Sequence, residues 1–216
     1  MSEPSFLTAT RASYDATAYE YVDMIGDSLD SMPLARALFG AFAELVRTGG
    51  GGMVADVGCG PGHVTALLHG LGLDVLGVDL SPEMIALARR LHPGPRYEVG
   101  SMLALDLPDA SLGGLLAYYS IIHIPRELRA EVFAEFRRVL APGGQLMLGF
   151  QVGDDTNHRD EVFGKPVNLD WHRQRPEEIA VLLREAGFEE RATVVSPPEA
   201  VGKPPHCHLL AYRPGA

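Results

Sequence analysis

Hydrophobic residues follow two patterns along this chain, short apolar runs and longer stretches in which apolar residues recur at helical spacing. The runs predict seven strands, at 53–57, 73–78, 96–99, 112–119, 145–150, 188–195 and 207–212. Helical spacing predicts helices at 32–46, 63–68, 82–91, 128–140 and 177–186. Residues 151–171 are polar and show neither period, so we expect an irregular insertion there.

Strands that alternate with helices pack into a mostly parallel sheet with helices on both faces. The last two predicted strands depart from this alternation, because only a loop rich in proline and glycine, 196–205, separates them. Such a loop leaves no room for a helical crossover, so the two strands should pair as a hairpin. We therefore expect one α/β domain over residues 1–216, a three-layer sandwich whose seven-stranded sheet has an antiparallel last strand.

The most specific motif follows the first predicted strand, where residues 56–62 read Asp-Val-Gly-Cys-Gly-Pro-Gly. Gly58, Gly60 and Gly62 allow a sharp turn and a close approach of the backbone to a ligand. The helix that follows turns its free amides and positive dipole end toward that turn. A strand, a glycine turn and a helix N-terminus together predict a nucleotide-type pocket.

Composition narrows the partners of this pocket. The length of 216 residues fits one domain. The net charge of −10 argues against nucleic acid as a partner. Two cysteines are too few for a disulfide scaffold, and no apolar run is long enough to span a bilayer. We expect a cytoplasmic protein, a monomer or homodimer, that acts away from membranes.

The D-x-G-x-G-x-G pattern at 56–62 resembles the cofactor loop of class I S-adenosylmethionine-dependent methyltransferases. The stretch 137–144, Arg-Arg-Val-Leu-Ala-Pro-Gly-Gly, and the antiparallel last strand are similar to the same family. The resemblance implies a Rossmann-like fold, S-adenosyl-L-methionine as cofactor and methyl transfer to an oxygen or nitrogen of a small molecule. It divides the chain into N-terminal helices forming a lid (1–48), a cofactor-binding core (53–150) and an insertion over the acceptor pocket (151–171).

The same resemblance, with the strand ends, indicates which residues hold the cofactor. Asp79 ends the second predicted strand, where its carboxylate can accept both ribose hydroxyls. Leu80 and Met84 would contact the adenine, Ser101 and the Met102 amide would bind its polar edge, and the Tyr118 carbonyl would hold the amino group. The remaining cofactor contacts are expected from the loop and from a lid tyrosine over the sulfonium: Asp56, Gly58, Cys59, Gly60 and Tyr14.

Catalytic residues are expected after the fourth strand and in the insertion. His123 could take a proton from a phenol or alcohol acceptor, or it could only fix the start of the following helix. His158, Trp171 and His172 could contact the acceptor, and Tyr19 could join the lid. His206 should emerge at the cofactor edge, with Cys207 on the opposite face, so no metal site is expected.

Two other functions stay open at this point. The first is an NAD-dependent oxidoreductase, whose glycine motif would need glycine at position 63, where His63 stands. The predicted terminal hairpin also counts against it, because a standard dinucleotide-binding sheet has no such hairpin. A non-catalytic protein that binds S-adenosylmethionine would keep the same pocket without turnover. The Asn/Asp-Pro-Pro-Tyr tetrapeptide of relatives that methylate amides and bases is missing after the fourth strand, which favours a small-molecule acceptor.

Overall fold

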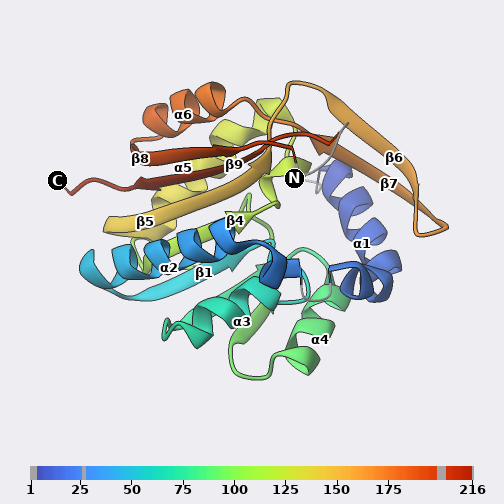
Figure 1. Ribbon diagram of the computed structural model, residues 1–216, viewed down its shortest axis with the longest axis horizontal. Coiled ribbons are helices and arrows are strands. Elements are labelled where there is room, and N and C mark those ends of the chain that lie inside the picture. The colour runs from blue at the N-terminus through green and yellow to red at the C-terminus, as the bar shows by residue number, and fades with distance from the viewer. Residues whose placement is uncertain (1–3, 26–27, 199–202, 216) are drawn as a thin grey trace.

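The computed structural model describes residues 4–25, 28–198 and 203–215 (Figure 1). Parts of the expected lid (1–3, 26–27) and of the loop before the last strand (199–202) lie outside the described residues. Seven strands form one sheet in the order β3-β2-β1-β4-β5-β9-β8. Their bounds are Met53–Val57 (β1), Val75–Asp79 (β2), Arg96–Val99 (β3), Leu112–Tyr118 (β4), Leu140–Gln151 (β5), Glu189–Ser196 (β8) and His206–Tyr212 (β9).

The direction of the strands confirms the predicted topology. Strands β1 to β5 pair in parallel, whereas β9 lies antiparallel to both β5 and β8. Several strand bounds differ from the prediction, and the backbone accounts for two of them. β4 ends at Tyr118, because Tyr119 adopts a left-handed backbone with φ +54°. β5 begins at Leu140, because the Gly143 amide donates to Arg213 O (2.7 Å) and keeps this turn in the sheet.

Helices cover both faces of the sheet (Figure 1). They are α1 (Ser5–Ile25), α2 (Pro33–Thr48), α3 (His63–Gly70), α4 (Pro82–Leu91), α5 (Arg129–Val139) and α6 (Pro176–Glu185), with short 3₁₀ turns η1 (Ser28–Ser31), η2 (Ile121–His123) and η3 (Arg126–Leu128). The predicted start of α4 is confirmed, since Ser81 Oγ accepts a hydrogen bond from the Met84 amide (3.1 Å).

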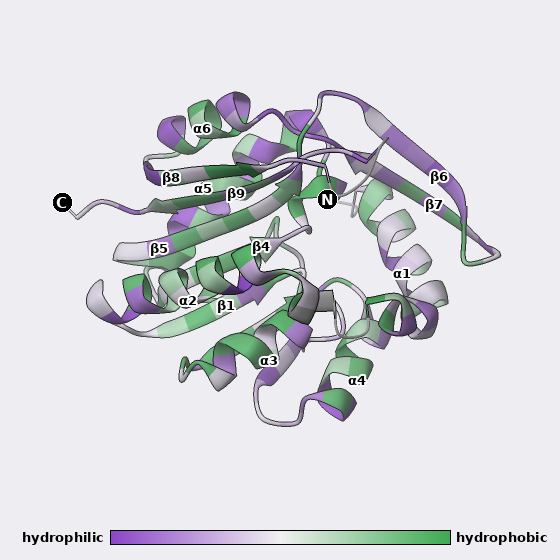
Figure 2. Cartoon of the chain, viewed as in Figure 1, coloured by the Kyte–Doolittle hydropathy of each residue, from purple (hydrophilic) through white to green (hydrophobic). Residues whose placement is uncertain are grey.

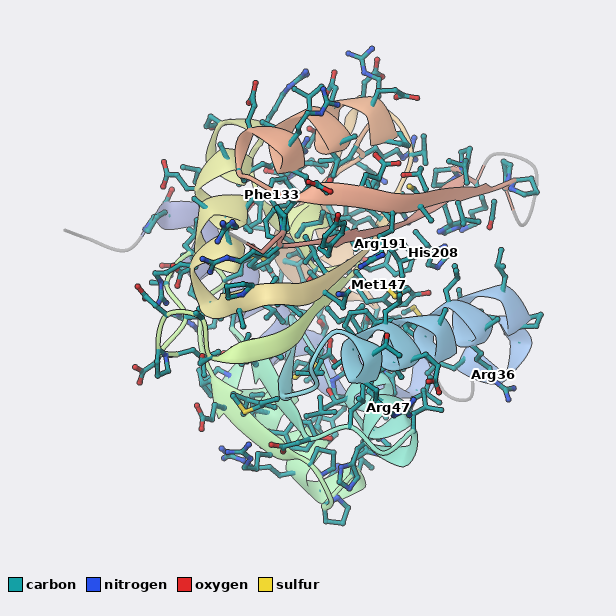
Figure 3. The ribbon with its side chains drawn as sticks, turned by 90° about the vertical axis from the view of Figure 1, so that its left-hand side faces the viewer. Arg36, Arg47, Phe133, Met147, Arg191 and His208 are labelled. Atoms are coloured by element: carbon teal, nitrogen blue, oxygen red, sulfur yellow. The ribbon has the colours of Figure 1, made fainter. Side chains whose placement is uncertain are left out.

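Two apolar layers hold the helices to the sheet. Phe133, Phe136 and Ile179 from α5 and α6 pack against one face, and all three are fully buried. Phe39 and Phe42 from α2 pack against the other face, on which Figure 3 also places Met147 and His208. Figure 2 shows the corresponding apolar stretches running through the central strands. Among the described residues, no helix has the length and apolar character needed to cross a membrane.

The insertion at 151–171 is not irregular, and that prediction was wrong. It folds as a separate two-stranded hairpin of β6 (Thr156–Val162) and β7 (Lys165–His172), which is largely hydrophilic (Figures 1 and 2). Phe163 and Gly164 have φ values of +55° and +73°, as in the tight turns that match the twist of paired strands. Lys165 Nζ fastens the hairpin to α1 by donating to Ala16 O (2.7 Å) and pairing with Glu20 (2.6 Å).

The strand order determines where a ligand can enter. From β1 the chain builds outward in both directions, to β2 and β3 on one side and to β4 and β5 on the other. In open parallel sheets this reversal leaves a crevice at the carboxyl ends of the two central strands. The glycine motif lies at the carboxyl end of β1, so the fold places it at this crevice.

Candidate cofactor and acceptor site

The glycine turn takes a backbone form that only glycine adopts easily. Gly58, Gly60 and Gly62 have φ values of +78°, +54° and +87°. A Cβ on Gly58 would lie 2.1 Å from Ser120 Cβ, and one on Gly62 would lie 2.7 Å from the Tyr97 hydroxyl, so both glycines serve packing within the protein. At Gly60 the nearest atom is Tyr21 Cε1 at 4.0 Å. Gly60 is therefore the glycine whose missing side chain leaves room for a ligand.

Asp79, at the end of β2, ties this turn to α4. Its Oδ2 accepts from the Gly60 amide (2.7 Å) and its Oδ1 from the Ser81 amide (2.9 Å). Burial raises the pKa of this carboxyl, and the two amide bonds oppose that rise. Each carboxylate oxygen can accept more than one hydrogen bond, so acceptor sites remain for a diol in the cavity.

Asp56 is more buried than Asp79 and anchors the glycine turn to α3. It is buried, and its Oδ2 accepts from Thr65 Oγ1 of α3 (2.6 Å). Burial raises the pKa of Asp56 to about 7. Cys59 is also buried, packed with Ile85 and Tyr97, and burial raises the pKa of its thiol. Both residues border the cavity, while the Asp56 carboxylate bonds Thr65 and the Cys59 side chain packs into the protein interior.

One cavity joins all the predicted cofactor residues and His123. It extends from the glycine turn along the start of α4 to the loop after β3 and to the end of β4. The predicted cofactor residues that border it are Tyr14, Asp56, Gly58, Cys59, Gly60, Asp79, Leu80, Met84, Ser101, Met102 and Tyr118, and the predicted catalytic residue His123 borders it too. Residues from five strand ends and helix starts therefore meet at the crevice that the strand order predicts.

At the other end of the cavity, a tyrosine of α1 meets the turn after β4. The Tyr14 hydroxyl lies 2.8 Å from His123 Nε2, and the rings meet edge to face at 5.2 Å. His123 Nδ1 lies 3.1 Å from Asp170 O of the hairpin, so Nδ1 carries the ring hydrogen and Nε2 accepts from Tyr14. Burial lowers the pKa of His123 to about 4 and raises that of Tyr14 well above its usual value.

Helix α1 contributes more of the cavity wall than the sequence suggested. Besides Tyr14, residues at helical spacing along it border the cavity: Phe6, Leu7, Thr10, Arg11 and Tyr21. Arg11 Nε donates to Leu80 O (3.2 Å), and Tyr21 meets Tyr14 edge to face at 5.8 Å. Recurrence at 7, 11, 14 and 21 is the signal that could have identified this face.

Several predicted acceptor contacts lie elsewhere. Tyr19 is 56% exposed and sits beneath the Arg90 guanidinium, so it faces away from the cavity and the expectation that it joins the lid was wrong. His158 bonds Asp170 (2.8 Å) and His172 bonds Thr156 (2.8 Å), each across the hairpin. None of the described hairpin residues borders the main cavity, but two of them reach residues that do. The Asp170 carbonyl meets His123, and the Trp171 side chain lies beside the Tyr14 hydroxyl, whose pKa it lowers against the larger effect of burial.

Comparison with known proteins agrees with this geometry. A methyltransferase domain family matches residues 54–144. The chain is 35% identical over 124 residues to a malonyl-[acyl-carrier protein] O-methyltransferase of Pectobacterium atrosepticum, covering 51% of this chain and 47% of that protein. It is 29% identical to an N-demethylindolmycin N-methyltransferase of Streptomyces griseus, covering 74% of this chain and 79% of that protein.

Among solved structures, the fold is similar to a 1,6-didemethyltoxoflavin-N1-methyltransferase of Burkholderia thailandensis, with bound 1,6-didemethyltoxoflavin and S-adenosylhomocysteine. The TM-score is 0.71 at 21% identity, covering 99% of this chain and 92% of that one. The chain spans about half the length of the first curated relatives that it matches. Residues 54–144 thus match a methyltransferase domain, and the seven-stranded sheet and the glycine turn are similar to those of class I S-adenosylmethionine-dependent methyltransferases.

Proposed function

We propose that this chain binds S-adenosyl-L-methionine in the cavity at the ends of β1 and β4, and that it methylates an oxygen or nitrogen of a small molecule. The observation that carries the proposal is the open position at Gly60, directly beside the Asp79 carboxylate. A nucleoside fits this arrangement, because its ribose hydroxyls need hydrogen-bond acceptors and because it needs room where it lies against the Gly60 backbone. The bound cofactor would supply a methyl group already activated on a sulfonium.

Each residue then has a role that its position supports. Asp79 would accept the ribose hydroxyls, Leu80 and Met84 would pack on the adenine, and Ser101 and Met102 would bind its edge. The Tyr118 carbonyl, at the end of β4, would receive the amino group. Asp56, through its bond to Thr65, would keep the glycine turn in place.

Tyr14 and His123 would act together at the methyl group. The Tyr14 hydrogen is committed to His123 Nε2, so the lone pairs of its oxygen are the part left to face an electron-poor methyl carbon. Because that bond occupies the Nε2 lone pair, His123 could abstract a proton directly only after losing Tyr14. We therefore assign His123 to positioning Tyr14, and the predicted role as a general base remains as the alternative.

The acceptor class rests on the relatives and on the wall of the cavity. The relatives named above include O- and N-methyltransferases, and their names state two small-molecule substrates and one substrate carried on a protein. Phe6, Leu7 and Ile124 give the acceptor end an apolar wall with polar groups at His123 and Tyr14. Apolar walls with few polar groups are typical of small-molecule sites.

The test follows the methyl group itself. The protein is incubated with S-adenosylmethionine labelled in its methyl group and with a small-molecule extract, and products are separated by mass spectrometry. A labelled small molecule together with S-adenosylhomocysteine is expected. Binding without any labelled product would instead favour the non-catalytic alternative, and oxidation of the extract with NAD would favour the oxidoreductase.

A further inference from the structure

A second phenol–imidazole pair lies at the same edge of the sheet. The Tyr119 hydroxyl is hydrogen-bonded to His206 Nδ1, and the two rings meet edge to face at 5.6 Å. Tyr119 follows β4, whereas His206 begins β9, 87 residues later. The antiparallel direction of β9 brings them together, because its first residue pairs with Gln151 at the carboxyl end of β5.

The backbone of Tyr119 is unusual for an aromatic residue. Its φ of +54° lies in the left-handed region, which bulky side chains rarely occupy and which costs about 1–3 kcal/mol. The Tyr119 amide donates to Gly149 O (2.8 Å), and the ring packs edge-on to Tyr118 at 4.6 Å, which together hold this form. Strand alternation no longer applies after β4, and Tyr119 borders the cavity.

We propose that Tyr119 takes the proton of the methyl acceptor and that His206 is the positioning residue that receives the Tyr119 proton; this rests on the proposed function. The acceptor is an alcohol, a phenol or an acidic N–H. Its heteroatom bonds the methyl carbon while the carbon–sulfur bond breaks, leaving that electron pair on sulfur. The acceptor proton passes to the Tyr119 oxygen as the Tyr119 proton passes to His206 Nδ1. The positive charge thus moves from the sulfonium to the His206 ring.

The surroundings of the two histidines favour His206 over His123 as the residue that finally holds the proton. Both ring nitrogens of His123 already have partners within the protein, Tyr14 and Asp170. His206 is half-buried at the first residue of its strand, from which a proton can reach solvent. His208 lies two residues along β9 (Figure 3), is 3% exposed and stacks on Tyr118. Burial, and then the nearby His206, lower the pKa of His208, so this ring does not place a second positive charge beside His206.

The experiment uses 4-nitrophenol, whose ionised form absorbs visible light, as a probe of proton transfer without turnover. The whole protein is first loaded with S-adenosylhomocysteine, and loading is verified by calorimetry. Nitrophenol is then added at a pH where the free phenol is mostly protonated. The wild type should increase the ionised fraction, and Tyr119→Phe and His206→Asn should each lower that gain by about tenfold. The double variant should lose no more than the single ones, as for residues that act as a unit.

Tyr212→Phe is the matched control, because it removes a hydrogen-bonded phenol from the far end of the same strand, where Tyr212 bonds Glu189. This variant should ionise the probe as the wild type does. Equal ionisation in wild type and Tyr119→Phe, or no ionisation in the wild type, would overturn the proposal while leaving cofactor binding intact. Failure of S-adenosylhomocysteine to load the wild type would instead reject the proposed function.

Discussion

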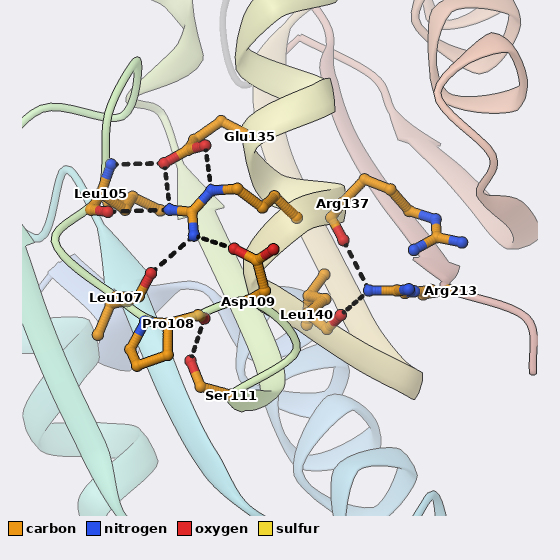
Figure 4. A network of polar contacts seen from close by, with 10 residues as sticks. Leu105, Leu107, Pro108, Asp109, Ser111, Glu135, Arg137, Leu140 and Arg213 are labelled. Atoms are coloured by element: carbon orange, nitrogen blue, oxygen red, sulfur yellow. Dashed lines mark hydrogen bonds and ion pairs between the residues drawn. The ribbon is translucent and has the colours of Figure 1, made fainter.

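Arg138 offers the strongest test of how α5 holds the loop that ends the cofactor cavity. Its guanidinium donates to Leu105 O (3.0 Å) and Leu107 O (2.7 Å), and to both carboxylate oxygens of Glu135 (2.8 Å each) (Figure 4). A fifth bond goes to Asp109 (2.7 Å), which is largely exposed. Glu135 in turn accepts from the Leu105 amide (2.6 Å). One arginine therefore fixes the loop that follows Ser101 and Met102.

The loss expected from Arg138→Ala follows from these bonds. A hydrogen bond to a charged group contributes about 1.5–3 kcal/mol, and such bonds in one network are not additive. The pair with Asp109 contributes little because that side chain is exposed, and the Arg138 side chain is itself one-third exposed. We expect a loss of about 3 kcal/mol in the free energy of unfolding, or about 6–12 °C in Tm for a domain of this size.

Chemical denaturation and thermal unfolding measure this loss, with Arg184→Ala as control, since Arg184 is an exposed arginine in the last turn of α6. The deficit should also depend on pH. In the folded protein, the hydrogen bond from Arg138 is the largest cause that lowers the pKa of Glu135. The stability that this bond contributes is therefore present above the pKa of Glu135 in the unfolded chain, and it is lost as the pH falls through the pKa of Glu135 in the folded protein. The difference between variant and wild type should shrink below about pH 4. A loss under about 1 kcal/mol, or one that does not change with pH, would refute the reasoning.

Three further substitutions probe the site. Asp79→Ala should weaken binding of S-adenosylhomocysteine by about 10- to 150-fold, as expected for bonds to a charged group, and unchanged affinity in calorimetry would remove Asp79 from the site. In His123→Ala, misplacement of Tyr14 should lower turnover by about tenfold, whereas a loss of about 10²–10⁴ in a stable variant would make His123 itself the base. Burial raises the pKa of Asp56 to about 7, so folding stability should fall as the pH rises from about 4 to 7. This slope should decrease in Asp56→Asn, and an equal slope in both proteins would contradict it.

The sheet could be predicted from the sequence because its physical signals are local. Buried parallel strands appear as apolar runs, and the short loop 196–205 requires an antiparallel return. The hairpin at 156–172 was missed for a physical reason. Its first strand carries polar and charged residues on both faces, so no apolar period marks it, although Val167, Leu169 and Trp171 alternate in the second.

The site was predictable only where it depends on backbone. Gly60 and Asp79 could be identified because a strand end, a turn and a helix start determine their positions. The Tyr14–His123 bond joins residues 109 positions apart, and Tyr119–His206 joins residues 87 apart. Such pairs follow from how α1 and β9 pack on the sheet, which no local pattern encodes. The left-handed backbone of Tyr119 likewise departs from what its residue type favours.

The central claim is that the space at Gly60 receives S-adenosylmethionine, and calorimetry on three proteins tests it most directly. Gly60→Val is compared with Gly72→Val, because both glycines have positive φ (+54° and +86°) and the same backbone strain is imposed in each. A Cβ on Gly72 meets nothing within 4 Å, and Gly72 lies outside the cavity. Wild type and folded Gly72→Val should bind S-adenosylmethionine and not NAD, and folded Gly60→Val should bind neither. Undiminished binding by Gly60→Val, or binding of NAD by the wild type, would contradict the account.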